Sequence, residues 1–391
     1  MTQYVAVLGR QPEFGLAELE SLLGANAVTA LPNGLALVST SQSIPYARFG
    51  AIIKFAKVVA AVKSVAPNSL CTQIAEYLLN QYPYQSGVKL KIGISDYSNT
   101  LSTRSLQALG LSIKKILKKN GYSVRVVPNK STKLSTAQII HNKLTHEHGA
   151  EFVIGSSHGS HLLAINTYEQ DIEAYTARDQ ARPMRDARVG MLPPKLAQTI
   201  INLATSLVTA ERNTILDPFC GTGVILQEAG LMGYSVYGTD LEERMVRYSR
   251  DNIQWLQQSH HVRFEWFLEV GDAASHKWRQ PVDFIAAESY LGRPLSSLPS
   301  RSELMDIVQN VNTLHKKVLK NLHAQLAPET RICLAVPAWQ TPSGYVSLPI
   351  LDQIDKMGYN QLVFSHTNAH NLIYARSQQI VGRQLVVLQK Q

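Results

Sequence analysis

The 391-residue chain is poor in cysteine, and no stretch of it approaches the roughly 20 consecutive apolar residues that a membrane-spanning helix needs. Its three cysteines, Cys71, Cys220 and Cys333, lie far apart and form no CxxC pair, so the sequence indicates neither a disulfide framework nor a metal site. The opening stretch MTQYVAVLGR lacks the basic region and the cleavage site of a secretory signal. We therefore expect a reduced, cytoplasmic protein, a monomer with no membrane partner and no metal ion.

Acidic residues are nearly missing from one part of the chain. Between residues 88 and 146, eleven Lys and Arg residues stand against a single acid, Asp96, which gives this segment a net charge of +10. The whole chain carries +9, so this segment holds the entire positive excess. Such a block favours a polyanion such as RNA as the partner, whereas the alternative is a solvated helix face. The candidate phosphate contacts are Lys114, Lys115, Lys118, Lys119, Arg125 and Lys130.

The chain is too long for one small core, and the order of its predicted elements suggests how it divides. Residues 1–66 and 67–168 both read as α+β units. Residues 169–192 have mixed charge and little apolar periodicity, which is typical of a connector. From 193 to 391 strands and helices alternate, and this pattern predicts a doubly wound α/β domain whose parallel strands present ligands at their carboxyl ends.

Local signals predict where some elements begin and end. Ser135 is a suitable N-cap for the helix STAQIIHNKL, and Gly121 suits the position just after the lysine-rich helix. The stretch LPILDQIDKMG, residues 348–358, predicts a further helix before two final strands.

A glycine turn follows the first strand of the alternating region. ILDPFCGTGVILQEAG contains Asp217, Gly221 and Gly223, and glycine lets the backbone turn tightly and approach a ligand closely. No Gly-Lys-Ser/Thr follows, which excludes a P-loop, and the full GxGxxG pattern is missing. Asp240 ends the strand SVYGTD, where a carboxylate can accept hydrogen bonds from both ribose hydroxyls. Asp272 ends the stretch EVGD and could accept from an adenine amino group.

These acids favour S-adenosylmethionine as the cofactor. Its sulfonium and its ammonium are both cationic, so acids at successive strand ends suit it better than they suit an anionic dinucleotide. The alternative is that Asp240 and Asp272 only cap the helices that follow them.

LPPKLAQTIINLA and the following LDPFCGTGVILQEAGLMGYSVYGTDLEERMV resemble the methyltransferase domain of the THUMP-containing tRNA guanosine N2-methyltransferases, which modify guanosine ten in archaea and eukaryotes. YVAVLGRQPEFGLAELESLLG resembles the ferredoxin-like start of that family. The resemblance implies a ferredoxin-like domain over 1–66, an RNA-binding THUMP domain over 67–168, and a Rossmann-like class I methyltransferase domain with a mostly parallel seven-stranded sheet over 193–391.

The same resemblance implies an activity and a set of site residues. THUMP would hold tRNA while the Rossmann-like domain transfers methyl from S-adenosylmethionine to the exocyclic N2 of a guanosine, with position 10 as the expected target. The segment around Arg182 and Pro183 would flank the cofactor pocket. The implied cofactor contacts are Asp217, Phe219, Gly221, Gly223, Asp240, Leu241, Asp272, Ala273 and Lys195.

The end of the fourth strand departs from the family pattern. Similar amino-methyltransferases carry Asp/Asn-Pro-Pro-Tyr there, whereas this chain has Glu288, Ser289 and Tyr290. A guanine amine is a poor nucleophile, so a carboxylate and a backbone carbonyl must accept its N–H groups while an aromatic ring stacks on the base. We expect Glu288 to be that carboxylate, Ser289 to supply the carbonyl, and Tyr290 to be the ring.

Other readings of this strand end stay open. Glu288 could pair with Arg293 on the surface while Tyr290 only packs, which would describe a non-catalytic tRNA-binding protein with a vestigial methyltransferase domain. An amino-methyltransferase acting on rRNA or DNA would keep the chemistry and change the substrate. The sequence also leaves open whether one or two methyl groups are added and whether a small activating protein is required.

Overall fold

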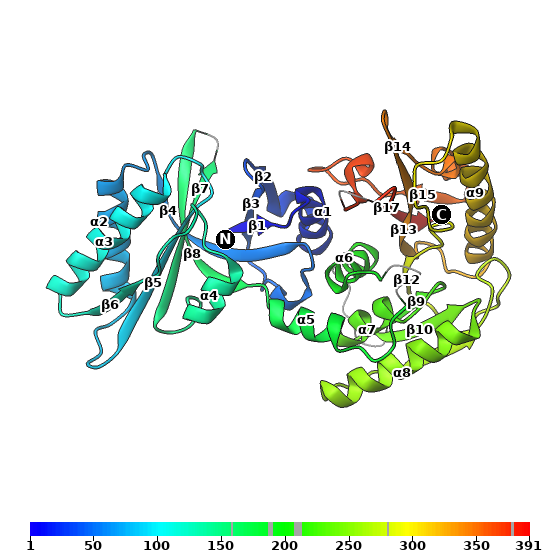
Figure 1. Cartoon of the computed structure of the whole chain (residues 1–391), viewed down its shortest axis with the longest axis horizontal. Helices are drawn as coiled ribbons and strands as arrows, with labels where there is room; N and C mark the ends of the chain where they lie inside the picture. Colours follow the sequence, from blue (N-terminus) through cyan, green and yellow to red (C-terminus); the bar gives the residue numbers. More distant parts are fainter. Residues whose placement is uncertain (158, 187–190, 207–212, 280, 377–378) are drawn as a thin grey trace. The chain divides into compact units, whose positions relative to one another are not determined.

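The computed structural model forms two compact units (Figure 1). It describes residues 1–157, 159–186, 191–206, 213–279, 281–376 and 379–391. The amino-terminal unit comprises Met1–Leu16, Asn26–Ala47 and Ile52–Ile172. The carboxy-terminal unit comprises Ala17–Ala25, Arg48–Ala51 and Glu173–Gln391. Among the described residues no helix combines the length and the apolar character needed to cross a membrane.

The amino-terminal unit is built on one eight-stranded sheet with the order β2-β3-β1-β4-β8-β7-β5-β6. The long strand β4 pairs antiparallel with β8, so the two stretches predicted as separate domains share this sheet. A domain boundary at residue 66 and the ferredoxin-like and THUMP assignments stay predictions. The strands are β1 (Thr2–Leu8), β2 (Val28–Leu31), β3 (Leu35–Thr40), β4 (Ile52–Val62), β5 (Lys89–Asp96), β6 (Ser123–Val126), β7 (Gly149–Ser157) and β8 (Ser160–Glu169).

The helices of this unit begin and end at the signals that the sequence carries. Ser135 accepts a hydrogen bond from the Gln138 amide, and the Gln138 side chain bonds back to Ser135, which is a complete capping box. Gly121 has a φ of +89° just after the lysine-rich helix, as predicted. The helices are α2 (Pro67–Gln81), α3 (Thr103–Lys119) and α4 (Thr136–Asn142), and α1 (Pro12–Leu23) begins in this unit, whereas its residues from Ala17 on belong to the carboxy-terminal unit.

A buried cation links three strands of the sheet. Lys54 of β4 donates to both carboxylate oxygens of Glu151 of β7, at 2.7 and 2.8 Å, and lies 3.6 Å from Glu169 of β8. Burial works against the charged ammonium, but the carboxylates, Glu151 foremost, outweigh it and raise the pKa of Lys54. A paired charge of this kind is tolerated only while its partners stay in place.

Replacing Lys54 by Met should therefore lower the free energy of unfolding of this unit by about 3–5 kcal/mol, because Glu151 would remain as an uncompensated buried charge. Hydrogen exchange of β4 and β7 amides in the full chain measures the effect. Lys57→Met, at an exposed position of the same strand, is the control and should change stability by less than about 0.5 kcal/mol. Equal effects of the two substitutions would refute the role of the buried pair.

The carboxy-terminal unit contains the predicted Rossmann-like sheet. Its main path of seven strands runs β11-β10-β9-β12-β13-β17-β15, while β14 pairs with β13 and β16 pairs with β17. Strands β9 to β13 are parallel and β17 is antiparallel to β13, which confirms the mostly parallel prediction. The strands are β9 (Thr214–Asp217), β10 (Ser235–Asp240), β11 (Trp266–Val270), β12 (Phe284–Glu288), β13 (Arg331–Thr341), β14 (Gly344–Val346), β15 (Tyr359–Gln361), β16 (Ile373–Tyr374) and β17 (Val381–Lys390).

Helices cover this sheet, and two stretches differ in detail from a simple reading of the sequence. The segment predicted as a connector contains helix α5, and its residues 187–190 lie outside the described part of the chain. The helix predicted over 348–358 is wrong, because two short 3₁₀ turns, Pro349–Gln353 and Asp355–Met357, occupy that stretch. The helices are α5 (Ile172–Gln180), α6 (Pro194–Thr205), α7 (Val224–Leu231), α8 (Glu243–Ser259) and α9 (Arg301–His323).

The 3₁₀ turns have a physical cause. The Asn312 side chain of α9 accepts a hydrogen bond from the Ile350 amide at 2.8 Å and fixes the start of the segment. Gly358, with a φ of +82°, ends it, and buried Tyr359 then begins β15. Between these two ends the segment forms 3₁₀ turns rather than an α-helix, and Ile350 and Ile354 remain buried.

Candidate active site

Strands β10, β9 and β12 are neighbours in the parallel sheet (Figure 1), and each of them ends in an acid. Asp217, Asp240 and Glu288 are the last residues of β9, β10 and β12. Burial raises the pKa of Asp217 well above its usual value, and the negative charges of Asp240 and Glu288 nearby raise it further. An edge that gathers like charges in this way is suited to a cationic ligand.

The glycine turn is fixed against the next strand and against α8. The Gly221 amide donates to Asp240 Oδ2 at 2.9 Å, and the Ser249 hydroxyl of α8 donates to the Gly221 carbonyl at 2.8 Å. Gly223 has a φ of +82°, and a Cβ atom there would lie 2.9 Å from Ser249 Oγ and 3.2 Å from Ser249 Cα. Both the backbone conformation and the close approach of α8 therefore require glycine at 223.

Asp240 has two local partners and still faces an open surface. Its Oδ2 accepts from Gly221, and its Oδ1 accepts from the Glu242 amide at 2.9 Å. The N-cap of α8 is Glu242, so the alternative in which Asp240 caps this helix is wrong. Burial raises the pKa of Asp240. The next side chain, Leu241, is 71% exposed, which places a bare apolar surface beside a carboxylate. This combination is suited to a nucleoside, with polar ribose hydroxyls and an apolar base face.

Asp272 and Ala273 lie just beyond the end of β11. Asp272 is exposed, and its Oδ1 accepts a hydrogen bond from the Ala274 amide at 2.9 Å, which closes a tight turn. Ala273 is buried. The turn leaves the remaining oxygen lone pairs of Asp272 available to a ligand.

Two polar residues of α8 complete the support of the glycine turn, and the sequence reasoning missed them. Asn252 Nδ2 donates to the carbonyls of Thr222 and Met184, at 2.9 and 3.0 Å, and its Oδ1 accepts from the Met184 amide at 2.9 Å. Asn252 thus ties the glycine turn to the segment before α6. The available signal was the placement of Ser249 and Asn252, three residues apart, on the apolar face of an amphipathic helix.

Glu288 is paired with a residue that the sequence did not suggest. The Arg383 Nε of β17 donates to Glu288 Oε1, with the two side chains 6% and 18% exposed. The expected alternative partner, Arg293, is therefore not the one found. Burial raises the pKa of Glu288, and the positive charge of Arg383 opposes that rise without cancelling it.

Ser289 is buried, whereas Tyr290 is not. The Ser289 amide donates to the Ala335 carbonyl at 3.0 Å and so continues the β12–β13 ladder, which a proline at this position could not do. Its Oγ lies 2.8 Å from Nε2 of His315 on α9. Tyr290 is 47% exposed, which argues against the reading in which it serves only for packing.

The remaining predicted cofactor residues, Phe219 and Lys195, lie in the glycine turn and on α6 respectively. The Phe219 amide donates to Asp217 Oδ1 at 3.0 Å, so Phe219 belongs to the glycine turn. Lys195 of α6 has its ammonium 5.0 Å from the centre of the Tyr175 ring of α5. Arg182 is buried, with only 3% of its surface exposed. The assignment of Lys195 to the cofactor stays a prediction.

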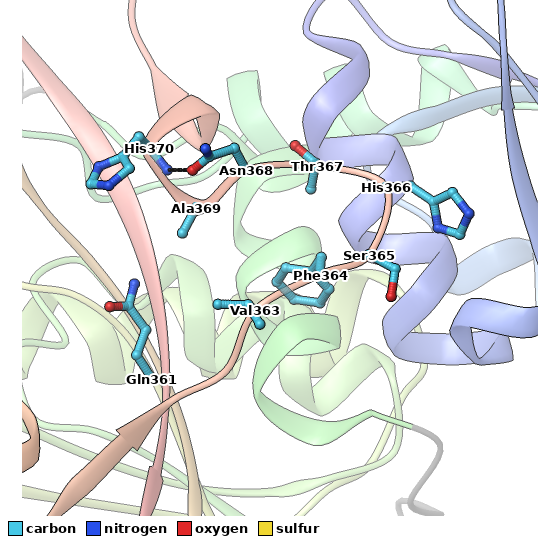
Figure 2. Close-up of a pocket in the computed structure, with 9 residues that line it drawn as sticks. All are labelled: Gln361, Val363, Phe364, Ser365, His366, Thr367, Asn368, Ala369 and His370. Carbon is cyan, nitrogen blue, oxygen red and sulfur yellow. Dashed lines mark hydrogen bonds between the residues drawn. The ribbon is translucent and has the colours of Figure 1, made fainter.

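A hollow of about 600 Å³ lies in the loop between β15 and β16 (Figure 2). Its lining residues are Gln361, Val363, Phe364, Ser365, His366, Thr367, Asn368, Ala369 and His370. Asn368 Oδ1 accepts from the His370 amide at 2.9 Å, which holds the loop in its curve. None of the lining residues is an acid, so this hollow does not suit a cationic cofactor as the carboxylate edge does.

The candidate RNA contacts lie in the amino-terminal unit. Leu106, Leu109, Ile113 and Leu117 form the buried face of α3, and Lys115, Lys118 and Lys119 are exposed. Lys114 is half-buried, whereas Arg125 and Lys130 are exposed. Within the described residues none of these six cations forms an ion pair with an acid.

Lys130 also borders a groove of about 720 Å³ in the same unit. Lys133 and Tyr97 line this groove, with the Lys133 ammonium 4.5 Å from the centre of the Tyr97 ring. The Tyr97 side chain is itself buried, so the ring packs beneath the lysine and offers no open face for stacking on a base.

Comparisons with known proteins place the carboxy-terminal unit in a family. The model of the RMKL-like, methyltransferase domain family matches residues 182–355. The tRNA (guanine(10)-N2)-dimethyltransferase of Methanothermobacter thermautotrophicus is 35% identical over 161 residues, which are 41% of this chain and 43% of that protein. The Pyrococcus abyssi protein of the same name is 31% identical over 150 residues, which are 38% and 39% of the two chains. The match spans less than half the length of these two relatives.

Solved structures share the fold over the whole chain. TrmN from Thermus thermophilus has a TM-score of 0.50 at 13% identity, covering 100% of both chains. A possible methylase from Clostridium difficile 630 has a TM-score of 0.51 at 15% identity, covering 100% of this chain and 97% of that one. At such identities these likenesses concern the fold alone.

One more relative covers enough sequence to decide the family. A probable tRNA (guanine(10)-N2)-dimethyltransferase of Methanothermococcus thermolithotrophicus is 35% identical over 126 residues, which are 32% of this chain and 74% of that protein. The glycine turn and the acidic strand ends lie within the segment that the family model matches. The chain belongs to the family of the tRNA (guanine(10)-N2)-dimethyltransferases.

Proposed function

We propose that this protein is a tRNA methyltransferase that transfers methyl from S-adenosylmethionine to the exocyclic N2 of a guanosine, and that position 10, named in its relatives, is the target. The observation that carries the proposal is the cluster of three carboxylates around the glycine turn, with Glu288 beside an exposed aromatic ring. The family membership supports the same substrate and reaction.

The residues at the carboxyl edge fit S-adenosylmethionine. Asp217 would face its cationic end, Asp240 its ribose hydroxyls, and the bare side chain of Leu241 its adenine. Gly221 and Gly223 let the backbone lie close to it. When bound, the cofactor supplies an electrophilic methyl group on a positively charged sulfur.

The protein's own part in the reaction is orientation. Within the described residues Glu288 Oε2 has no hydrogen-bond partner, so it can accept an N–H of the guanine amine. The Ser289 carbonyl would accept the other N–H, and the Tyr290 ring would stack on the base. These contacts point the nitrogen lone pair at the methyl carbon, which lowers the entropic part of the barrier.

The amino-terminal unit would supply most of the affinity for tRNA. The unpaired cations of α3 would contact phosphates through interactions that weaken as salt rises. We further propose that the protein acts in the cytoplasm as a monomer. The cofactor-binding experiment below tests for a vestigial pocket. Screening with other nucleic acids and with added proteins tests for an rRNA or DNA substrate and for an activating protein partner.

Asp240→Ala should weaken S-adenosylmethionine binding by at least about tenfold, because a hydrogen bond to a charged group is worth about 1.5–3 kcal/mol. Calorimetry on the full chain measures this. Glu243→Ala, an exposed acid three residues away, is the control and should bind as the wild type does. A wild-type protein that binds no S-adenosylmethionine would identify the methyltransferase domain as vestigial.

Glu288→Ala should reduce methyl transfer to tRNA by at least about 100-fold, the lower end of what a positioned acid–base group contributes. Cofactor affinity should stay within about twofold of the wild type, since Glu288 is assigned to the base and not to the cofactor. Mass spectrometry of tRNA nucleosides after incubation with labelled cofactor identifies the nucleotide, the atom and the number of methyl groups. Persistent turnover would remove Glu288 from the site.

Reversing the charge of Lys118 and Lys119 to Glu should weaken binding to all tRNAs alike and reduce the slope of log affinity against log salt by about 2. The matched control is the exposed pair Lys316 and Lys317 of α9, reversed in the same way. Binding assays at several salt concentrations compare the two. If the α9 reversal weakens binding as much as the α3 reversal, the assignment of α3 fails.

A further inference from the structure

We propose that Arg383 is a positioning residue of the methyl-transfer site: it holds Glu288 Oε1 and so directs Oε2 toward the guanine amine. This inference rests on the proposed function. It accounts for the departure from the Asp/Asn-Pro-Pro-Tyr pattern by a side-chain restraint supplied from β17, 95 residues further along the chain.

Strand register places the two side chains on one face of the sheet. Glu288 of β12 lies opposite Ala335 of β13, and Arg383 of β17 lies opposite Pro337 of β13. Ala335 and Pro337 are two residues apart, so their side chains point to the same face and bring Glu288 and Arg383 to that face. The small side chain of Ala335 leaves the space between them open for the ion pair.

The contact with Arg383 restricts a glutamate side chain that would otherwise be flexible. Glu has one more rotatable bond than the Asp or Asn of the family pattern, so an unrestrained Glu288 would spread its carboxylate over several positions. Arg383 removes this freedom at Oε1, because its side chain is buried and its Nε donates to that oxygen. Ser289, bonded to Ala335 and beside His315, fixes the backbone that proline would otherwise stiffen.

The positive charge of Arg383 also affects the ionisation of Glu288. The charged and titratable groups that face Glu288 are Arg383 from β17, Asp217 from β9 and, through Ser289, His315 from α9. Burial lowers the pKa of His315, which disfavours a positive charge on its imidazole. Arg383 is therefore the group among these that favours the ionised form of Glu288 and opposes the effect of burial on its pKa.

The test is the pH profile of methyl transfer by Arg383→Met in the full chain. Removing the guanidinium removes the influence that opposes burial, so the pKa of Glu288 should rise and the acid limb of kcat/KM should move to higher pH. We expect kcat to fall about 10- to 100-fold near neutral pH, with S-adenosylmethionine affinity within twofold of the wild type. Arg383→Lys, which keeps the charge and loses the Nε donor, should keep the acid limb and lose part of kcat.

A double-mutant comparison separates positioning from a general loss of structure. In a Glu288→Gln background no carboxylate needs a counter-charge, so adding Arg383→Met should cost less than threefold and should leave no acid limb. Lys390→Met removes a cation from the opposite end of β17 and should leave the profile unchanged. Equal losses from Arg383→Met in both backgrounds, or an unmoved acid limb, would overturn the proposal.

The two proposals fail in different ways. A wild-type protein that binds S-adenosylmethionine but methylates no tRNA would refute the proposed function and the positioning role with it. Methylation by the wild type, with Arg383→Met matching it at every pH, would refute the positioning role alone. If Arg383→Met does not fold, as judged by lost cofactor binding, Arg383→Lys and the Glu288→Gln pair still decide the question.

Discussion

Repulsion between carboxylates at the carboxyl edge of the sheet is the constraint around which the methyltransferase domain is arranged. Asp217 is buried, and Asp240 and Glu288 lie near enough to raise its pKa. Each of the latter two has a compensating partner: the Gly221 amide for Asp240 and the guanidinium of Arg383 for Glu288. Three acids at one edge, each with a pKa raised by burial, favour a cationic ligand, because a positive charge there would stabilise their ionised forms.

The supporting contacts around this edge come from elements on both of its sides. Ser249 and Asn252 of α8 fix the glycine turn, and Asn252 also holds the segment at Met184. On the other side of the site, His315 of α9 contacts Ser289. The glycine turn and the end of β12 are therefore held by separate helices, α8 and α9.

The sequence predicted those parts of the site that depend on local pattern. The glycine turn, Asp240 at the end of β10 and Glu288 at the end of β12 could be predicted because each follows an apolar strand directly. Arg383 could not, since its pairing depends on the antiparallel register of β17 across β13. The error at residues 348–358 has a related cause, because Asn312, a residue of another helix, fixes how that segment begins.

The pairing of β4 with β8 has a consequence for how the amino-terminal unit assembles. The eleven residues of β4 lie in the middle of the sheet, yet their partners on one side, in β8, are about a hundred residues later in the chain. During synthesis β4 therefore leaves the ribosome long before Glu151, and Lys54 has no counter-charge in that interval. Contacts of such sequence separation form slowly, so the half-made sheet presents an open apolar edge to other chains.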